Sequence, residues 1–336
     1  MLGSSQTTLR GAISPVVQKT IDSMLSGDRR ALARLLTLVE RDDFQVRELM
    51  QAIHPHVGET YTVGITGPPG AGKSTLVDGL LTLLRGDGKR IGVLAADPTS
   101  PFTGGAVLGD RVRMQKHYLD PEVFIRSLAT RGSHGGLPEV TMRAIRVLAA
   151  SAKDYVLVET VGVGQTELDI VGMADTVVVT LVPEAGDAVQ TMKAGLMEVA
   201  DIFVINKSDR PGATQLETAL RAMLNLDPRR NERRTPVLLT EAHTGKGLEE
   251  LYRSVLQHQK EQIETNKLTE RRQGRHRQEF LQTISKWVEG RVVDLAQQSE
   301  ELGQLIENVD KGNQDPYAAA KEAMESSIVL QNWVLR

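Results

Sequence analysis

One short segment, Gly67–Ser74, constrains the fold of this chain more than any other feature. It reads GPPGAGKS and matches the pattern G-x-x-x-x-G-K-[ST]. The apolar run Tyr61–Thr66 precedes it, and a stretch with helical periodicity follows it. A strand, a glycine-rich turn and a helix in this order point backbone N–H groups and the positive end of a helix dipole at a bound phosphate. A turn that merely joins a strand to a helix does not need lysine followed by serine, so the segment predicts a nucleotide-phosphate site.

The residues of this segment have separate expected roles. We expect the Lys73 ammonium to reach the β- and γ-phosphates as a catalytic group, and the Ser74 hydroxyl to bind Mg²⁺. The predicted phosphate-binding residues are Gly67, Pro68, Pro69, Gly70, Ala71, Gly72, Lys73, Ser74 and Thr75.

Short, β-branched apolar runs alternate with helical stretches through the middle of the chain. Strands buried on both faces of a parallel sheet read as continuous apolar runs of this kind, and the alternation predicts helices on both faces. We therefore predict an α/β fold, with a mostly parallel sheet in a P-loop domain over residues 58–259 and helical extensions at 1–57 and 260–336. The expected strands are Tyr61–Thr66, Arg90–Ala96, Val123–Leu128, Tyr155–Glu159, Thr176–Val182, Ile202–Asn206 and Pro236–Thr240.

The composition excludes several functional classes. The chain has 336 residues, a formal net charge of −3 and no cysteine. The lack of cysteine removes disulfides, thiolate metal sites and thiol catalysis. The small net charge gives no general attraction to nucleic acid or to an anionic membrane, and no apolar run reaches the roughly 18 residues of a membrane span. We expect a cytoplasmic protein with neither a nucleic-acid nor a membrane partner.

A second motif, NKSD at residues 206–209, follows the sixth predicted strand. The Asp209 carboxylate can accept hydrogen bonds from guanine N1–H and the 2-amino group, and adenine offers neither donor there. Asn206 can bond the base edge or brace the phosphate loop, and the Lys207 stem can cover the base. The predicted base-binding residues are Asn206, Lys207, Asp209, Glu241 and Ala242. The last two follow the seventh predicted strand and are expected to bring backbone to guanine O6, although they lack the serine-alanine form usual in GTPases.

Carboxylates near three further strand ends predict the metal and γ-phosphate side of the site. Glu159 opens the sequence ETVG, where many GTPases have D-x-x-G. We expect its carboxylate to hold the metal and to orient the attacking water, and the Gly162 N–H to sense the γ-phosphate. Asp97 and Asp110 fit the outer shell of Mg²⁺, which takes few protein ligands and keeps several waters. The predicted metal-binding residues are Ser74, Asp97, Asp110 and Glu159.

Together these residues resemble the methylmalonyl-CoA mutase-associated GTPases. This group of P-loop proteins includes a human mitochondrial member and bacterial proteins that are also labelled arginine/ornithine transport kinases. Besides the two nucleotide motifs, the resemblance rests on residues 96–111, 130–136, 159–165 and 315–317.

The resemblance implies a chaperone role. Such GTPases bind adenosylcobalamin-dependent acyl-CoA mutases, gate the loading of the cobalamin cofactor, and protect or reactivate the mutase. The resemblance also implies a homodimer joined by the C-terminal helices, here residues 260–336, and a nucleotide-responsive loop at 184–193. It leaves open which acyl-CoA mutase is the client.

Two alternatives remain at this point. A metal-insertion GTPase for a nickel enzyme has a similar fold but carries cysteine and histidine clusters, whereas this chain has no cysteine and seven scattered histidines. A P-loop kinase needs a pocket and a base for a phosphoryl acceptor, and the sequence offers no such constellation. No catalytic glutamine or arginine finger stands out, so we expect slow GTP hydrolysis that a partner accelerates.

Overall fold

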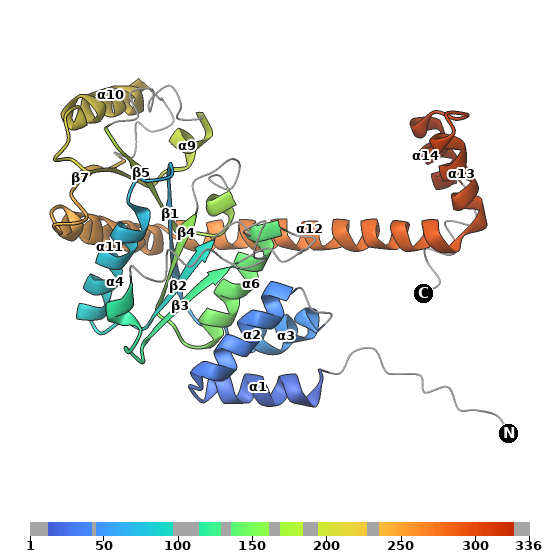
Figure 1. Ribbon diagram of the computed structural model, residues 1–336, viewed down its shortest axis with the longest axis horizontal. Coiled ribbons are helices and arrows are strands. Elements are labelled where there is room, and N and C mark those ends of the chain that lie inside the picture. Colours follow the sequence, from blue (N-terminus) through green and yellow to red (C-terminus); the bar gives the residue numbers. More distant parts are fainter. Residues whose placement is uncertain are drawn as a thin grey trace. The chain divides into compact units, whose positions relative to one another are not determined.

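The computed structural model describes residues 13–41, 45–96, 114–128, 136–160, 169–183, 194–226 and 235–325. Figure 1 gives the order of the elements along the chain. The contacts divide the chain into two compact units, Met1–Thr269 and Glu270–Arg336. Three predicted site residues, Asp97, Asp110 and Gly162, lie outside the described residues, as does the segment 184–193.

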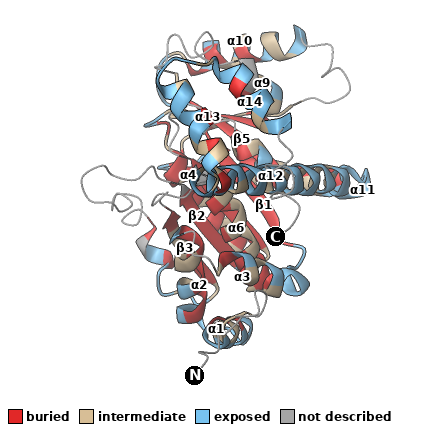
Figure 2. Ribbon diagram, turned by 90° about the vertical axis from the view of Figure 1, so that its right-hand side faces the viewer, coloured by how far each residue is buried: buried red, intermediate tan, exposed pale blue. Residues whose placement is uncertain are grey.

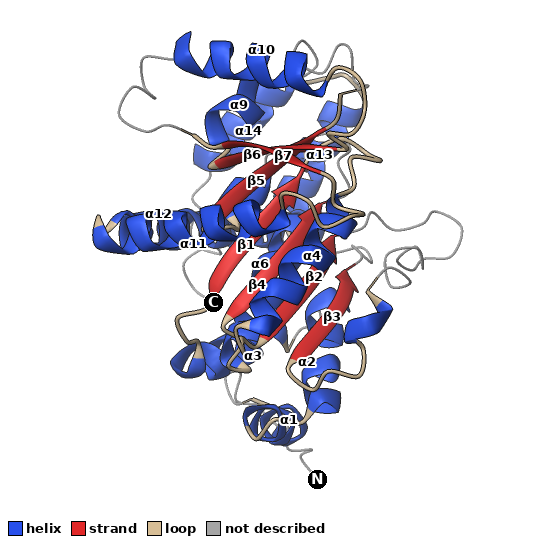
Figure 3. Ribbon diagram, turned by 90° about the vertical axis from the view of Figure 1, so that its left-hand side faces the viewer, coloured by secondary structure: helices blue, strands red, loops and turns tan. Residues whose placement is uncertain are grey.

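The first unit is built on a parallel sheet, which in the described residues has the strand order β3-β2-β4-β1-β5-β6-β7 (Figure 3). Every adjacent pair of strands is parallel. The strands are β1 (Tyr61–Thr66), β2 (Ile91–Ala96), β3 (Val123–Leu128), β4 (Tyr155–Thr160), β5 (Thr176–Leu181), β6 (Ile202–Asn206) and β7 (Val237–Thr240). The predicted α/β fold is confirmed, and each predicted strand is present with its ends shifted by no more than one residue.

Apolar side chains cover both faces of this sheet. In β4, Val156 and Val158 belong to one buried cluster and Leu157 belongs to the other, because successive side chains of a strand point to opposite faces. The helices packed on the Leu157 face are α4 (Lys73–Gly86) and α11 (Leu248–Glu264). The opposite face carries α6 (Gly136–Ala150), η3 (Ile170–Gly172), α9 (Ala194–Val199) and α10 (Ala213–Leu226).

The N-terminal helices belong to the same buried cluster as α6. They are α1 (Pro15–Leu25), α2 (Arg29–Arg41) and α3 (Val46–Ile53), and the short helix η1 (His54–His56) follows. Their amphipathic faces bury apolar side chains, among them Ile21, Leu35 and Leu49. Figure 2 shows the buried parts of the chain in red. Arg126 of β3 also donates to both carboxylate oxygens of the buried Glu40 on α2, at 2.9 and 2.5 Å. The N-terminal region is therefore attached to the sheet domain by apolar packing and by an ion pair.

The second unit is helical. It contains most of α12 (Lys267–Gln298), with α13 (Glu300–Asp310) and α14 (Pro316–Glu325). Ser299 caps α13 by accepting a hydrogen bond from the Leu302 N–H, and Asp315 accepts one from the Ala318 N–H at the start of α14. Within residues 270–325, Leu295, Leu302 and Leu305 form a buried apolar cluster. Among the described residues, no helix is long and apolar enough to cross a membrane.

Candidate nucleotide site

The predicted nucleotide motifs meet at the carboxyl ends of neighbouring strands. The strands β4, β1, β5, β6 and β7 are consecutive in the sheet and run in the same direction. The phosphate loop follows β1, and Glu159 of β4 lies beside Ile65 of β1. Asn206 ends β6 beside Thr240 of β7. Open parallel sheets bind their ligands at this edge, so the fold brings the phosphate and base motifs to one place.

The phosphate loop packs closely against β5. Gly67 has a φ of 137°, and a Cβ at this position would lie 2.1 Å from the backbone oxygen of Thr180, so the position requires glycine. Helix α4 begins at Lys73 and places its first N–H groups at the loop. The buried Lys73 Nζ donates to the carbonyl oxygens of Gly67 at 2.8 Å and Pro68 at 3.0 Å. A cation and a helix N-terminus thus meet at the loop, an arrangement that suits phosphate.

Ser74 and Glu159 form the described part of the predicted metal site. Ser74 Oγ donates to Glu159 Oε1 at 2.6 Å, and both side chains are buried. The contact joins the first turn of α4 to the end of β4. A hydroxyl oxygen and a carboxylate oxygen are hard donors of the kind that Mg²⁺ takes from proteins, with water completing its shell. These two residues therefore fit a magnesium ion.

The Asn206 side chain fastens three loops together on the base side of the site. Its Nδ2 donates to the Ala71 carbonyl oxygen of the phosphate loop at 2.8 Å. Its Oδ1 accepts from Thr240 Oγ1 and from the Ala242 N–H, both at 3.0 Å. Because Asn206 is buried and its amide is used in this way, it braces the phosphate loop, which is one of its two predicted roles. We name Asn206, Ala71, Thr240 and Ala242 the Asn206 clasp.

The remainder of the base motif lies at the surface. Lys207 adopts a left-handed conformation with a φ of 57°. The Ser208 N–H then donates to the Thr240 carbonyl oxygen, and the Arg210 N–H donates to the Lys207 carbonyl oxygen, both at 3.0 Å. This turn leaves Asp209 exposed. A residue that binds the guanine base of an incoming nucleotide must be accessible in this way.

The loop after β7 contains an ion pair between Glu241 Oε1 and Lys246 Nζ, which lie 2.6 Å apart. The hydrogen bond to Glu241 raises the pKa of Lys246, and the same bond lowers the pKa of Glu241, so both groups are charged at neutral pH. The Ala242 N–H is already engaged in the Asn206 clasp. The expected contact of this loop with guanine O6 therefore stays a prediction.

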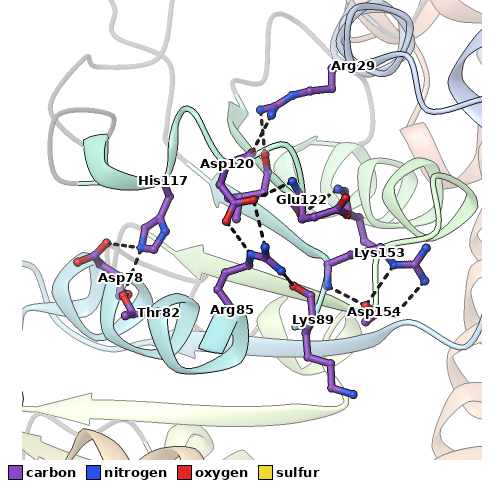
Figure 4. Close-up of polar contacts among 12 residues, drawn as sticks. Arg29, Asp78, Thr82, Arg85, Lys89, His117, Asp120, Glu122, Lys153 and Asp154 are labelled. Carbon is purple, nitrogen blue, oxygen red and sulfur yellow. Dashed lines mark hydrogen bonds and ion pairs between the residues drawn. The ribbon is translucent and has the colours of Figure 1, made fainter. Parts of the chain in front are cut away.

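A polar cluster anchors α4 downstream of the phosphate loop (Figure 4). Asp78 on α4 pairs with Lys116 Nζ at 2.8 Å and with His117 Nε2 at 3.4 Å, both from the short helix η2 (Gln115–His117). Thr82 on the next turn of α4 also contacts the His117 ring, at 3.2 Å. Burial lowers the pKa of His117, and this effect outweighs the attraction of Asp78. The helix that begins with Lys73 is thus fixed to the residues that follow segment 97–113.

A second ion pair, between Arg85 and Asp120, continues this cluster (Figure 4). Arg85 Nε lies 2.7 Å from Asp120 Oδ2, and this hydrogen bond lowers the pKa of Asp120. Arg29 of α2 donates to the backbone oxygens of Asp120 and Val123, at 2.7 and 2.9 Å. The start of β3 is therefore held by α4 and by the N-terminal helices together.

Known proteins agree with this geometry. Residues 32–300 match the model of a family described as methylmalonyl Co-A mutase-associated GTPase. The chain belongs to this family. Since the relatives are named as GTPases, the chain is a P-loop GTP hydrolase, which binds GTP and GDP.

Relatives match along most of the chain. A protein from Pyrococcus abyssi that is named as a GTPase is 49% identical over 316 residues, which cover 93% of this chain and 97% of that protein. The mitochondrial methylmalonic aciduria type A homolog of Mus musculus is 35% identical over 279 residues, or 78% of this chain and 67% of that protein. The crystal structure of an LAO/AO transport system kinase superposes with a TM-score of 0.67 at 26% identity, covering 94% of this chain and 99% of that one.

Two residues that contact the candidate site residues were not predicted from the sequence. Thr240 belongs to the Asn206 clasp through its hydroxyl group, and Lys246 pairs with Glu241. Thr240 is the last residue of β7, directly before the loop that carries Glu241 and Ala242. This position could have indicated that its hydroxyl group contacts the base motif. The turn residues Thr244 and Gly245 between Glu241 and Lys246 could have indicated that the loop folds back on itself.

Proposed function

We propose that this GTPase is a chaperone of an adenosylcobalamin-dependent acyl-CoA mutase, and that it couples GTP hydrolysis to cofactor loading and to protection or reactivation of the mutase. The observation that carries the proposal is the family match over residues 32–300, because the family is described by its association with methylmalonyl Co-A mutase. The similarity to a mouse protein named for methylmalonic aciduria also supports a role connected with methylmalonyl metabolism.

In the proposed reaction, water attacks the γ-phosphate of GTP at the edge of the sheet. Lys73 and the N-terminus of α4 bind the phosphates, and Glu159 orients the attacking water or accepts its proton. When bound, Mg²⁺ would be held by Ser74 and Glu159 together with the predicted ligands Asp97 and Asp110, and it would supply positive charge to the phosphates. The Gly162 N–H senses the γ-phosphate. Positioning and charge neutralisation account for most of the acceleration in phosphoryl transfer of this kind.

Guanine selectivity is assigned to the NKSD motif. Asn206 holds the base loop against the phosphate loop, so that the exposed Asp209 has a fixed place relative to the phosphates. The Asp209 carboxylate receives guanine N1–H and the 2-amino group. ATP would leave this carboxylate without donors, at a cost of about 1–3 kcal/mol.

We also propose a homodimer formed through α12. Apolar side chains recur along one side of this helix at helical spacing and are 39% to 63% exposed: Phe280, Leu281, Ile284, Trp287, Val288 and Val292. An amphipathic helix with an exposed apolar side normally packs that side against a partner. A second copy of the chain is the partner that the family resemblance implies.

The kinase and nickel-insertion alternatives have less support. The superposed crystal structure is named as a transport system kinase, but that name applies to the other protein, and the sequence offers no constellation of a pocket and a base for a phosphoryl acceptor. Within the described residues, no group of three or more histidine, aspartate or glutamate side chains could hold a transition metal.

The chaperone proposal is tested with an adenosylcobalamin-dependent acyl-CoA mutase from the same genome. The purified mutase is mixed with this GTPase in GDP, in a non-hydrolysable GTP analogue, or without nucleotide. Complex formation is measured by light scattering, and mutase inactivation is followed during turnover. We expect a complex whose stability depends on the nucleotide and slower inactivation of the mutase. If no mutase from that genome binds in any nucleotide state, the chaperone proposal fails, although the GTPase assignment stands.

A further inference from the structure

We infer that Lys246 is a positioning residue for guanine recognition. Its ammonium neutralises the Glu241 carboxylate, so that Glu241 and Asp209 do not both present a negative charge to the base. The inference rests on the proposed role of Asp209 in reading guanine. It assigns a specificity function to a lysine outside the NKSD motif.

The loop that carries the pair is closed on itself by backbone contacts. The Glu241 N–H donates to the Lys246 carbonyl oxygen at 2.9 Å, and the Gly245 N–H donates to the Glu241 carbonyl oxygen at 3.1 Å. The Thr244 hydroxyl also donates to that Glu241 oxygen, at 3.0 Å. Because the backbone sets the distance between Glu241 and Lys246, their ion pair costs less side-chain entropy than a pair of independent surface residues.

The same loop is fixed to the base motif. The Asn206 clasp joins Asn206 to Thr240 and Ala242, which are the two neighbours of Glu241 in the chain. The Ser208 N–H donates to the Thr240 carbonyl oxygen at 3.0 Å. These contacts hold Glu241 close to the NKSD turn. After the dominant hydrogen bond to Glu241, the charge of Asp209 also contributes to the raised pKa of Lys246, so the ammonium lies within electrostatic range of both carboxylates.

The exposures of the two partners differ. The Glu241 side chain is only 14% exposed, whereas the Lys246 side chain is 70% exposed. The Glu241 carboxylate carries a negative charge, and the Lys246 ammonium is its ion-pair partner. Without Lys246, the negative charge of Glu241 would act on Asp209 and on the electron-rich edge of the base.

The test is steady-state hydrolysis of GTP by the full chain and by Lys246→Met, which keeps the length of the stem and removes the charge. We expect the KM for GTP to rise about threefold to tenfold with little change in kcat, since one nearby charge is unbalanced. The increase should shrink at high salt, which screens exposed charges. Lys246→Arg should behave as the parent protein does.

The decisive variant is the double substitution Glu241→Gln with Lys246→Met. If Lys246 acts by neutralising Glu241, removing both charges restores the KM of the parent protein. If the double variant stays as weak as Lys246→Met, the lysine shapes the loop or touches the nucleotide, and the inference is wrong. An unchanged KM in Lys246→Met alone would also overturn it.

Asp209→Ala separates this inference from the base-site proposal. Loss of the preference for GTP over ATP in Asp209→Ala, together with a raised KM for GTP in Lys246→Met of the parent protein, supports both. If Asp209→Ala loses the preference but Lys246→Met is silent in the parent protein, only the inference about Lys246 fails. If Asp209→Ala keeps the preference, the base-site proposal itself fails.

Discussion

At the scale of single residues, one buried amide connects the phosphate and base halves of the site. Asn206 donates to the phosphate loop through Nδ2 and accepts from the loop after β7 through Oδ1. The sequence motif identifies Asn206 but leaves two roles open, the base edge and the phosphate loop. The fold decides between them, because the sheet places β6 beside β7 and only β5 separates β6 from β1.

Replacing Asn206 by alanine should weaken both folding and nucleotide binding. The substitution leaves buried groups of Ala71, Thr240 and Ala242 without this partner, so we expect a loss of about 2–4 kcal/mol in the free energy of unfolding. We also expect at least tenfold weaker GDP binding. Thr240→Val removes only one of the hydrogen bonds and should cost about 1 kcal/mol. Urea unfolding and calorimetric titration with GDP measure the two effects, and equal losses in the two variants would contradict the clasp.

Two glycines of the phosphate loop should respond differently to alanine. A Cβ at Gly67 would meet the Thr180 oxygen at 2.1 Å, whereas a Cβ at Gly70 would meet no described atom within 4 Å. Both residues have positive φ, so both substitutions carry a strain of about 1–2 kcal/mol. Gly67→Ala should cost about 3 kcal/mol or more in total, because the loop must also move away from β5. Thermal unfolding compares the variants, and a Gly70→Ala variant that is equally destabilised would be inconsistent with the loop geometry.

At the scale of elements, the strands were predictable and the polar contacts between elements were not. The strand Ile202–Asn206 is a continuous apolar run that ends in a polar motif, so its limits follow from burial on both faces. Nothing in the local sequence pairs Asp78 with Lys116 and His117, because that contact depends on how α4 packs beside η2. Ser74 and Glu159 are different, because the motifs predicted that both bind one metal ion, and the pairing of β1 with β4 brings them together.

The contact between α4 and η2 should make stability depend on pH in a defined direction. Burial lowers the pKa of His117 below its ordinary value of 6.5. As the pH falls through about 6.5, the unfolded chain therefore takes up a proton that the folded chain does not. Stability should decrease between about pH 7 and pH 5, and His117→Gln should reduce this slope. Urea unfolding across the range measures it, with the exposed His54→Gln as control. A slope that His117→Gln leaves unchanged would contradict the assignment.

At the scale of the whole molecule, the chain combines a GTPase unit with a helical unit. In the described part of the helical unit, Leu295, Leu302 and Leu305 form a buried cluster, while α12 exposes several large apolar side chains. An exposed apolar helix side of this kind gains stability when a partner covers it. The proposed function uses that surface for dimerisation and the nucleotide site for signalling to a mutase.

Ile284→Glu should disrupt the proposed dimer without impairing the nucleotide site. Ile284 is 40% exposed on the apolar side of α12, and a buried glutamate at a dimer interface would lack a partner. We expect a shift from dimer to monomer in light scattering, with unchanged GTP hydrolysis in the absence of a mutase. Gln282→Glu places the same charge on another side of the same helix and should leave the dimer intact. A monomeric parent protein, or equal effects of both variants, would refute this interface.

The account as a whole is tested most directly by steady-state hydrolysis of GTP and ATP, alone and with an adenosylcobalamin-dependent acyl-CoA mutase from the same genome. The account predicts slow hydrolysis that is selective for GTP, that rises several-fold with the mutase, and that loses its selectivity in Asp209→Ala. GTP hydrolysis that no mutase changes would contradict the client assignment, and equal hydrolysis of ATP would contradict the base site.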